Sequence, residues 1–298
     1  MKRIASIQDI SCVGKCSLTV ALPIISAMGV ECGIVPTAVL SVHTAFDSFT
    51  FDDLTDQIEP ISKSWKDNGV TFDAIYTGYL GSFEQLELVS RFFDEHAGDD
   101  TLVFVDPAMA DNGVLYKGFT PEFARAMGSV VCSKADIIDP NITEASFMLG
   151  KEYKEAGEYD EAYIKDLLQG LVGLGAKKAV LTGVSLEPGT CGVYGYDVES
   201  DAYFSYFNEL VDAKFHGTGD VFSSTAVGAL ITRSPASKRP CPIPTTTGTA
   251  SISRRRSRTC SNVSTPSIWF AAPRCGFALS ASRGFSLLLT FLHPDMLL

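Results

Sequence analysis

Short apolar runs of strand length alternate with stretches of helical apolar spacing through residues 1–233. The apolar runs predict strands at residues 3–7, 32–40, 72–77, 101–105, 136–138 and 178–181, and a hairpin pair at 191–196 and 202–206. The helical spacing predicts helices at residues 17–28, 51–65, 84–93, 121–127, 143–149, 163–174 and 221–231. Strands that alternate with helices predict a mostly parallel sheet with helices on both faces. In such a sheet, ligands bind beyond the carboxyl ends of the strands.

The glycine-broken loop before the helix at 221–231 is the most informative stretch of the chain. Gly217 and Gly219 let the backbone turn its N–H groups toward one point. The start of the helix adds unpaired donors and a partial positive charge, so this place suits an anion such as a phosphoryl group. Asp220 stands at the junction, where it either takes the proton of an attacking hydroxyl group or only caps the helix.

Other polar motifs follow predicted strands and are therefore expected at the same edge of the sheet. Residues 78–82, Gly-Tyr-Leu-Gly-Ser, follow one strand, Asp106 follows the next, and Asn141 opens the helix after a third. Asn141 and Glu144 are three residues apart, which places both on one face of a helical turn, with a capping pair as the alternative role. Asp106, Asn141 and Glu144 offer oxygen atoms to a hydrated Mg²⁺ ion. Together with Asp220, these residues are the parts of a phosphoryl-transfer site.

Charge and composition narrow the classes of function. The net charge is −11, and it divides into −18 for residues 1–233 and +7 for residues 234–298. The acidic first part argues against nucleic-acid binding. No apolar run approaches the roughly 18 residues of a membrane-spanning helix, and we interpret the protein as cytoplasmic. None of the 8 cysteines stands in a C-x-x-C pair, so zinc-ribbon and thioredoxin interpretations lack support.

The end of the chain has a different composition from the rest. Residues 233–298 are rich in Ser, Thr, Pro and Arg, without a sustained period before an apolar end at 285–292. One interpretation is a basic, disordered arm that binds nucleic acid or a partner. We favour out-of-frame translation, because the preceding domain stops in mid-helix and a shifted frame can encode an amphipathic helical segment. The domain would then span residues 1–232, the tail would be disordered, and this chain would be poorly active.

The order of the motifs resembles that of a known family. Residues 78–82, Asp106-Pro-x-Met, Pro-Asn141-x-x-Glu144 and Gly-Thr-Gly-Asp220 occur in the order found in the pyridoxal (pyridoxamine) kinases of the ribokinase-like superfamily. The resemblance covers residues 1 to about 232. It implies a three-layer α/β/α fold and ATP-dependent phosphorylation of the 5′-hydroxymethyl group of pyridoxal, pyridoxine or pyridoxamine.

The same resemblance assigns roles to individual residues. Asp220 would be the catalytic base, and an anion hole would be formed by the amides of Gly217, Thr218 and Gly219. The Mg²⁺ ion and the ATP phosphates would be organised by Asp106, Asn141 and Glu144. The nucleotide would be flanked by Thr182 and Gly183, and the vitamin ring would be contacted by Asp9, Thr44 and Tyr79. Two positions depart from the family pattern: Asp9 stands where many relatives have serine, and Gly183 where some have lysine.

Two alternatives stay open. The hydroxymethylpyrimidine kinases of thiamine synthesis have a similar scaffold, although residues 78–82 favour the pyridoxal side. A truncated, inactive product that only binds vitamin or nucleotide is a hypothesis of another class. The expected ligands are a B6 vitamer and ATP, with Mg²⁺ as cofactor and a monovalent cation as a further candidate. We expect a homodimer and no binding to nucleic acid or membranes.

Overall fold

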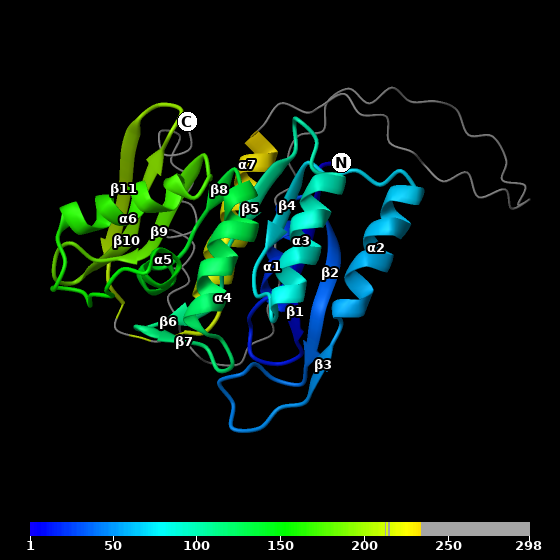
Figure 1. Cartoon of the computed structure of the whole chain (residues 1–298), viewed down its shortest axis with the longest axis horizontal. Coiled ribbons are helices and arrows are strands. Elements are labelled where there is room, and N and C mark those ends of the chain that lie inside the picture. Colours follow the sequence, from blue (N-terminus) through cyan, green and yellow to red (C-terminus); the bar gives the residue numbers. More distant parts are fainter. Residues whose placement is uncertain (212, 214, 234–298) are drawn as a thin grey trace, which may run out of the picture. The chain divides into compact units, whose positions relative to one another are not determined.

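The fold is built on a nine-stranded sheet whose six central strands run parallel (Figure 1). The computed structural model describes residues 1–211, 213 and 215–233, so the predicted tail lies outside the described residues except for Arg233. The strand order is β11-β10-β9-β8-β5-β4-β1-β2-β3. The strands are β1 (Arg3–Ser11), β2 (Glu31–Leu40), β3 (Phe51–Asp53), β4 (Ala74–Thr77), β5 (Leu102–Val105), β8 (Ile137–Ile138), β9 (Lys178–Val184), β10 (Thr190–Asp197) and β11 (Ala202–Glu209). A separate small hairpin consists of β6 (Ala110–Asp111) and β7 (Val114–Leu115).

Helices cover both faces of the sheet, as the alternation of elements predicts. The helices are α1 (Leu18–Ala27), α2 (Thr55–Asp67), α3 (Phe83–His96), α4 (Pro121–Ala126), α5 (Ile142–Leu149), α6 (Glu161–Gly173) and α7 (Thr218–Arg233). Helices α1 and α7 pack against each other on one face, while α2 to α6 lie on the other (Figure 1). The arrangement is the α/β/α fold that the sequence predicts.

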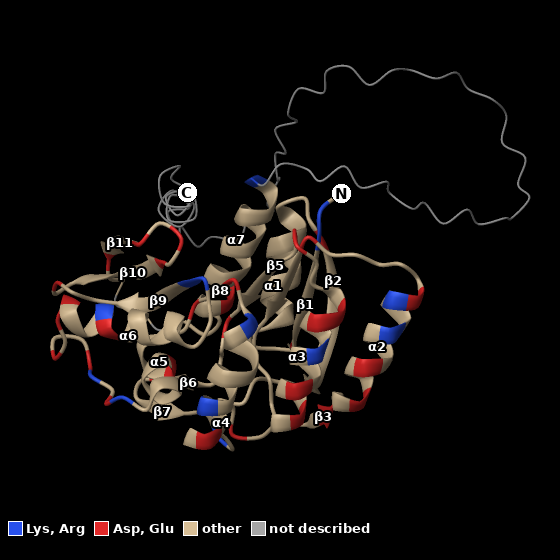
Figure 2. Cartoon of the chain, turned by 45° about the horizontal axis from the view of Figure 1, so that its top comes forward, with Lys and Arg blue, Asp and Glu red and all other residues tan. Residues whose placement is uncertain are grey.

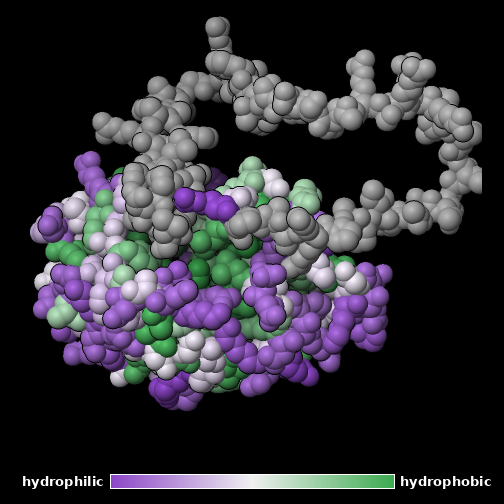
Figure 3. Space-filling model, turned by 90° about the horizontal axis from the view of Figure 1, so that it is seen from above, coloured by the Kyte–Doolittle hydropathy of each residue, from purple (hydrophilic) through white to green (hydrophobic). Residues whose placement is uncertain are grey.

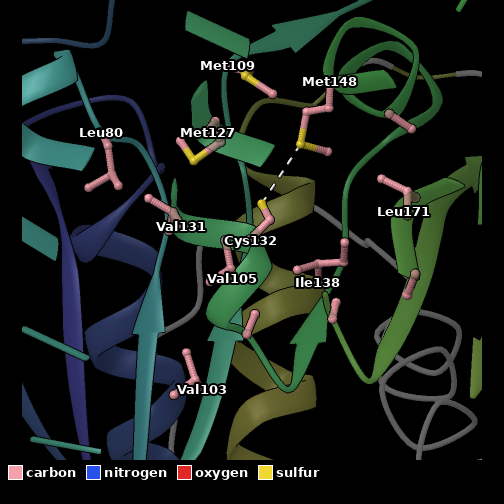
Figure 4. Close-up of a cluster of buried hydrophobic side chains, with 14 of the residues drawn as sticks. Leu80, Val103, Val105, Met109, Met127, Val131, Cys132, Ile138, Met148 and Leu171 are labelled. Carbon is pink, nitrogen blue, oxygen red and sulfur yellow. Dashed lines mark hydrogen bonds between the residues drawn. The ribbon is translucent and has the colours of Figure 1, made fainter. Parts of the chain in front are cut away.

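Two apolar cores form because successive residues of a strand point to opposite faces. Ile4 and Tyr76 pack beneath α1 and α7, whereas their neighbours in sequence, Ala5 and Ile75, belong to the larger core on the opposite face. Figure 4 shows part of the larger core, where Cys132 contacts Met148 between the sheet and the helices. This packing holds the carboxyl ends of the strands in place, and the polar motifs follow those ends.

Most predicted elements are present, but the predicted start of one helix was wrong. β1, β4 and β5 are neighbours in one sheet, as predicted for residues 3–7, 72–77 and 101–105. Residues 51–53, predicted as the start of a helix, instead form the short edge strand β3, which pairs antiparallel with the end of β2. Asp53 then accepts a hydrogen bond from the N–H of Thr55 at 2.8 Å, and the helix begins only there.

Charged residues are unevenly distributed over the helices. Lys, Arg, Asp and Glu mark the outward sides of α2, α3 and α6, whereas α1 and α7 are almost free of charge (Figure 2). Seen from above, the described surface is hydrophilic around its margin and apolar toward its centre (Figure 3). No helix within the described residues is long and apolar enough to cross a membrane. Apart from Arg233 at its end, Asp220 at the start of α7 is the one charged residue of that helix.

Candidate active site

The carboxyl ends of the parallel strands bring the predicted acids Asp9 and Asp106 to one edge, together with Asp139, which was not predicted as a site residue. Asp9 lies near the end of β1, and Asp106 and Asp139 directly follow β5 and β8. The N–H of Asp106 donates to the carbonyl of Thr77 at 2.9 Å, and that of Asp139 to the carbonyl of Val105 at 3.1 Å. Asp106 and Asp139 thus each continue the hydrogen-bond pattern of the neighbouring strand. All three acids are buried.

The glycines of the predicted cradle lie at the start of α7. Gly217 has a φ of +76°, and a Cβ atom there would lie 2.0 Å from the carbonyl oxygen of Lys15, so only glycine fits. Its carbonyl accepts the N–H of Val221 at 3.0 Å, which closes the first helical turn. The N–H groups of Thr218 and Gly219 are left without intrahelical acceptors. A Cβ at Gly219 would meet no atom within 4 Å, so the fold itself does not require a glycine there.

Asp220 is partly accessible, and its pKa is raised. The residue is partly buried, and burial, reinforced by the negative charge of Asp9, raises its pKa to about 6. A hydrogen bond from the backbone of Ser17 acts in the opposite direction. A carboxylate with a pKa just below neutrality is unprotonated at neutral pH and still has a useful affinity for a proton, which suits a general base.

Sequence reasoning missed a buried polar group that links α7 to the sheet. The hydroxyl of Ser223 lies 2.5 Å from Oδ2 of Asp139, to which it donates, and 3.3 Å from Oδ2 of Asp106. Burial raises the pKa of both acids, and the charge of Asp220 raises that of Asp106 further. The repeated Asp-Pro pair, which follows two strands that prove to be neighbours, was a signal for Asp139, but no signal in the sequence pointed to Ser223.

Asn141 and Glu144 form a complete capping box at the start of α5. Oδ1 of Asn141 accepts the N–H of Glu144 at 2.9 Å, and Oε2 of Glu144 accepts the N–H of Asn141 at 2.8 Å. Oε1 of Glu144 accepts the N–H of Met109 at 3.0 Å. The capping role weighed from the sequence is therefore present. Within the described ranges, no group of three or more His, Cys, Asp and Glu residues is close enough to hold a metal ion by itself.

Three of the five residues predicted to bind the nucleotide line one cavity, and Asp106 and Glu144 are not among its lining residues. Asn141, Thr182 and Gly183 border a space of about 380 Å³ between the start of α5 and the end of β9. The N–H of Thr182 donates to the carbonyl of Pro140 at 3.0 Å, which holds the two sides of this cavity together. Lys154 also lines the cavity and adds a cation that the sequence did not single out.

The residues predicted to contact a vitamin ring come from three separate segments. Asp9 is buried in β1, Tyr79 is partly buried after β4, and Thr44 is exposed between β2 and β3. Burial raises the pKa of Tyr79 to about 12, and the charge of Asp9 contributes to this rise. Beside Thr44, the His43 ring lies 4.6 Å from the ring of His216, which directly precedes the cradle. The His43–His216 contact brings the loop that carries Thr44 next to the cradle, and Asp9 lies close enough to His43 and Asp220 to affect the pKa of both.

A family model for phosphomethylpyrimidine kinase matches residues 23–238, which include every strand-end motif except Asp9. The chain belongs to the phosphomethylpyrimidine kinase family. The match ends five residues after the last residue of α7, close to the predicted domain boundary.

Relatives of this kinase extend the comparison. A structure from Bacteroides thetaiotaomicron, provisionally described as a phosphomethylpyrimidine kinase and solved with pyridoxal, is 39% identical with a TM-score of 0.74, over 78% of this chain and 81% of that chain. Pyridoxal kinase from Lactobacillus plantarum is 28% identical with a TM-score of 0.71, over 79% and 82% of the two chains. Pyridoxal kinase of Dictyostelium discoideum is 27% identical over 76% of this chain and 77% of its own. These relatives confirm the resemblance to the pyridoxal kinases.

Proposed function

We propose that this chain transfers the γ-phosphoryl group of ATP to the 5′-hydroxymethyl group of pyridoxal, pyridoxine or pyridoxamine. The observation that carries the proposal is the start of α7, where Asp220 stands beside the open Gly219 of the cradle. Helix N-termini with free N–H groups bind phosphoryl oxygens. The substrate class is supported by the pyridoxal complex of the 39% identical relative. The pyridoxal kinases of Lactobacillus plantarum and Dictyostelium discoideum point to the same class.

Each group of the site has a task in this reaction. Asp220 accepts the proton of the 5′-hydroxyl group as its oxygen forms a bond to the γ-phosphorus, while the bond from that phosphorus to the bridging oxygen of ADP breaks. The N–H groups of Thr218 and Gly219 stabilise the transferred phosphoryl oxygens. The cavity beside Thr182 and Gly183 accommodates the nucleotide. The vitamin ring lies between Asp9, Thr44 and Tyr79.

The acidic edge fits a hydrated Mg²⁺ ion. Within residues 1–211, 213 and 215–233, neither Asp106 nor Asp139 forms an ion pair with a basic side chain, and Oδ1 of Asp139 is buried without a hydrogen-bond partner. Asn141 and Glu144 already accept backbone N–H groups, so they would reach the ion through water molecules, which Mg²⁺ commonly retains. A bound Mg²⁺ would supply positive charge to the ATP phosphates. Asp106 would hold the ion together with Asn141 and Glu144.

The activity assay incubates the full chain with ATP and Mg²⁺ and with each of the three vitamers. We expect 5′-phosphorylated vitamer together with an equal amount of ADP, identified by mass spectrometry. Product from none of the three vitamers, while hydroxymethylpyrimidine is phosphorylated, would contradict the proposed substrate. ADP formation without any phosphorylated acceptor would contradict the transfer itself.

We expect the Glu144→Gln variant to require more Mg²⁺ than the parent chain. The substitution removes a buried carboxyl group close to Asp106, and groups that support a metal site contribute about tenfold in metal affinity. The Mg²⁺ concentration for half-maximal rate should therefore rise by about tenfold. The control is Glu84→Gln, which removes an exposed acid from the first turn of α3. An unchanged Mg²⁺ titration, combined with a lower melting temperature, would assign Glu144 to capping alone.

A further inference from the structure

Asp9 is a buried acid whose contacts support a negative charge without neutralising it. Its side chain is 4% exposed, and the hydroxyl of Ser11 donates to Oδ2 at 2.9 Å. The Ser17 side chain is a further hydrogen-bond partner that lowers the pKa of Asp9, against the larger effect of burial. Within the described residues, Asp9 makes no ion pair with a lysine, arginine or histidine. Buried charges without a partner are costly, and they are normally paired when the ligand is bound.

Among the described residues, two acids and no fixed cation face the proposed vitamin site. Asp220 faces Asp9 from α7, and the negative charge of Asp9 raises the pKa of Asp220. His43 faces it from the loop between β2 and β3, but burial and His216 lower the pKa of His43 and favour its neutral form. Cys16 and Tyr79 also lie close to Asp9. Burial raises the pKa of the Cys16 thiol and that of the Tyr79 phenol.

His43 is also held in a defined orientation. Its Nδ1 accepts the N–H of Ala45 at 3.2 Å, which places the ring proton of the neutral form on Nε2. Lys15, a cation of this region in the described part of the chain, is exposed and makes no ion pair with either acid. The site therefore offers a negative charge from Asp9 that a bound ligand has to match.

A B6 vitamer carries one feature that matches this charge. Its phenolic oxygen is acidic, its 5′-hydroxyl group goes to Asp220 in the proposed reaction, and its ring nitrogen becomes positively charged on protonation. Resting on the proposed function, we propose that Asp9 forms an ion pair with the protonated ring nitrogen of the vitamer. Asp9 thereby selects a pyridinium ring over an aminopyrimidine ring.

The selection follows from the difference in basicity between the two rings. A pyridine that bears an ionised phenolic oxygen holds its ring proton more tightly than an aminopyrimidine does. The ion pair with Asp9 therefore stabilises the bound vitamer more than it stabilises bound hydroxymethylpyrimidine. Asp9 then determines which of the two substrates of this kinase scaffold is preferred, although both present a hydroxymethyl group to Asp220.

The test measures kcat/KM for pyridoxine, pyridoxamine and hydroxymethylpyrimidine with the full chain and its Asp9→Asn variant. Asparagine keeps the shape and can still accept the Ser11 hydroxyl, but it lacks the charge. We expect kcat/KM for pyridoxine to fall by about tenfold or more, as for a lost charge-assisted hydrogen bond, while the value for hydroxymethylpyrimidine changes much less. The matched control, Ser11→Ala, keeps the charge of Asp9 and should leave the ratio between the two substrates unchanged.

Equal losses for both substrates in Asp9→Asn would overturn the inference while leaving the proposed function intact. A loss confined to pyridoxamine would show that Asp9 binds the ammonium group of that vitamer instead, and would also overturn it. Failure of the parent chain to phosphorylate any vitamer would count against the proposed function. A second measurement needs no variant: the benzene analogue of pyridoxine, which lacks the ring nitrogen, should bind the parent chain about tenfold more weakly than pyridoxine in the absence of ATP. Equal binding would overturn the inference.

Discussion

The Asp220→Asn variant is expected to lose about 10²–10⁴-fold in kcat and to bind ATP as the parent chain does. Asparagine can still accept the hydrogen bond from the Ser17 backbone, but it cannot take the proton of the attacking hydroxyl group. Removing the base acts on the transition state more than on ground-state binding. The measurement compares single-turnover rates and ATP affinity for the two chains.

The pKa of Asp220 also predicts how kcat/KM falls at acid pH. The pKa of Asp220 is raised to about 6, so the unprotonated base is lost as the pH falls through that value. In the parent chain kcat/KM should decline below about pH 6, and the residual activity of Asp220→Asn should lack this dependence. The control is Asp99→Asn, which changes an exposed acid shortly before β5 and so at the opposite edge of the sheet from the carboxyl ends of the strands. A loss of less than about tenfold in Asp220→Asn would make Asp220 a helix cap and not a base.

The Gly219→Ala variant is expected to lose about 10²–10³-fold in kcat without a loss of stability. The new methyl group meets no protein atom within 4 Å, so the fold accepts it. Alanine is also favoured over glycine inside a helix. The same methyl group would occupy the space where the phosphoryl group approaches the N–H groups of the cradle. The measurement is kcat together with the melting temperature.

Two further glycine variants separate packing from catalysis. Gly173→Ala in α6 also adds a methyl group with no atom within 4 Å, and it should leave both kcat and stability unimpaired. Gly217→Ala places its methyl group against the Lys15 carbonyl at a φ of +76°, so both the melting temperature and kcat should fall. If Gly219→Ala behaved like Gly173→Ala, the cradle would not contact the transferred group.

The fold could be predicted largely because the period of apolar residues changes between strands and helices. β3 could not, because a strand of three residues has no period of its own and merges with the helix that follows it. For Asn141 and Glu144, the sequence indicates both a capping pair and metal ligands, since the same residue types at the same spacing suit either role. The capping contacts are present, and the metal role stays a prediction.

The link between Asp139 and Ser223 shows a different limit. The two residues are 84 positions apart in the sequence, and nothing in either local segment indicates that they meet. Their contact follows from the pairing of β5 with β8 and from the position of α7 across the strand ends. The location of Asp220 was easier to predict, because the glycines and the helix that create its surroundings are its neighbours in the sequence.

The most direct test of the central claim is a competition in one tube. The full chain is given equal concentrations of pyridoxine and hydroxymethylpyrimidine with γ-labelled ATP and Mg²⁺, and the labelled products are separated and identified. Because the result is a ratio, it does not depend on how active the preparation is. We expect most of the label on the 5′-oxygen of pyridoxine, and we expect Asp220→Asn to form neither product at a comparable rate. Label found mainly on hydroxymethylpyrimidine, or equal product formation by Asp220→Asn, would contradict it.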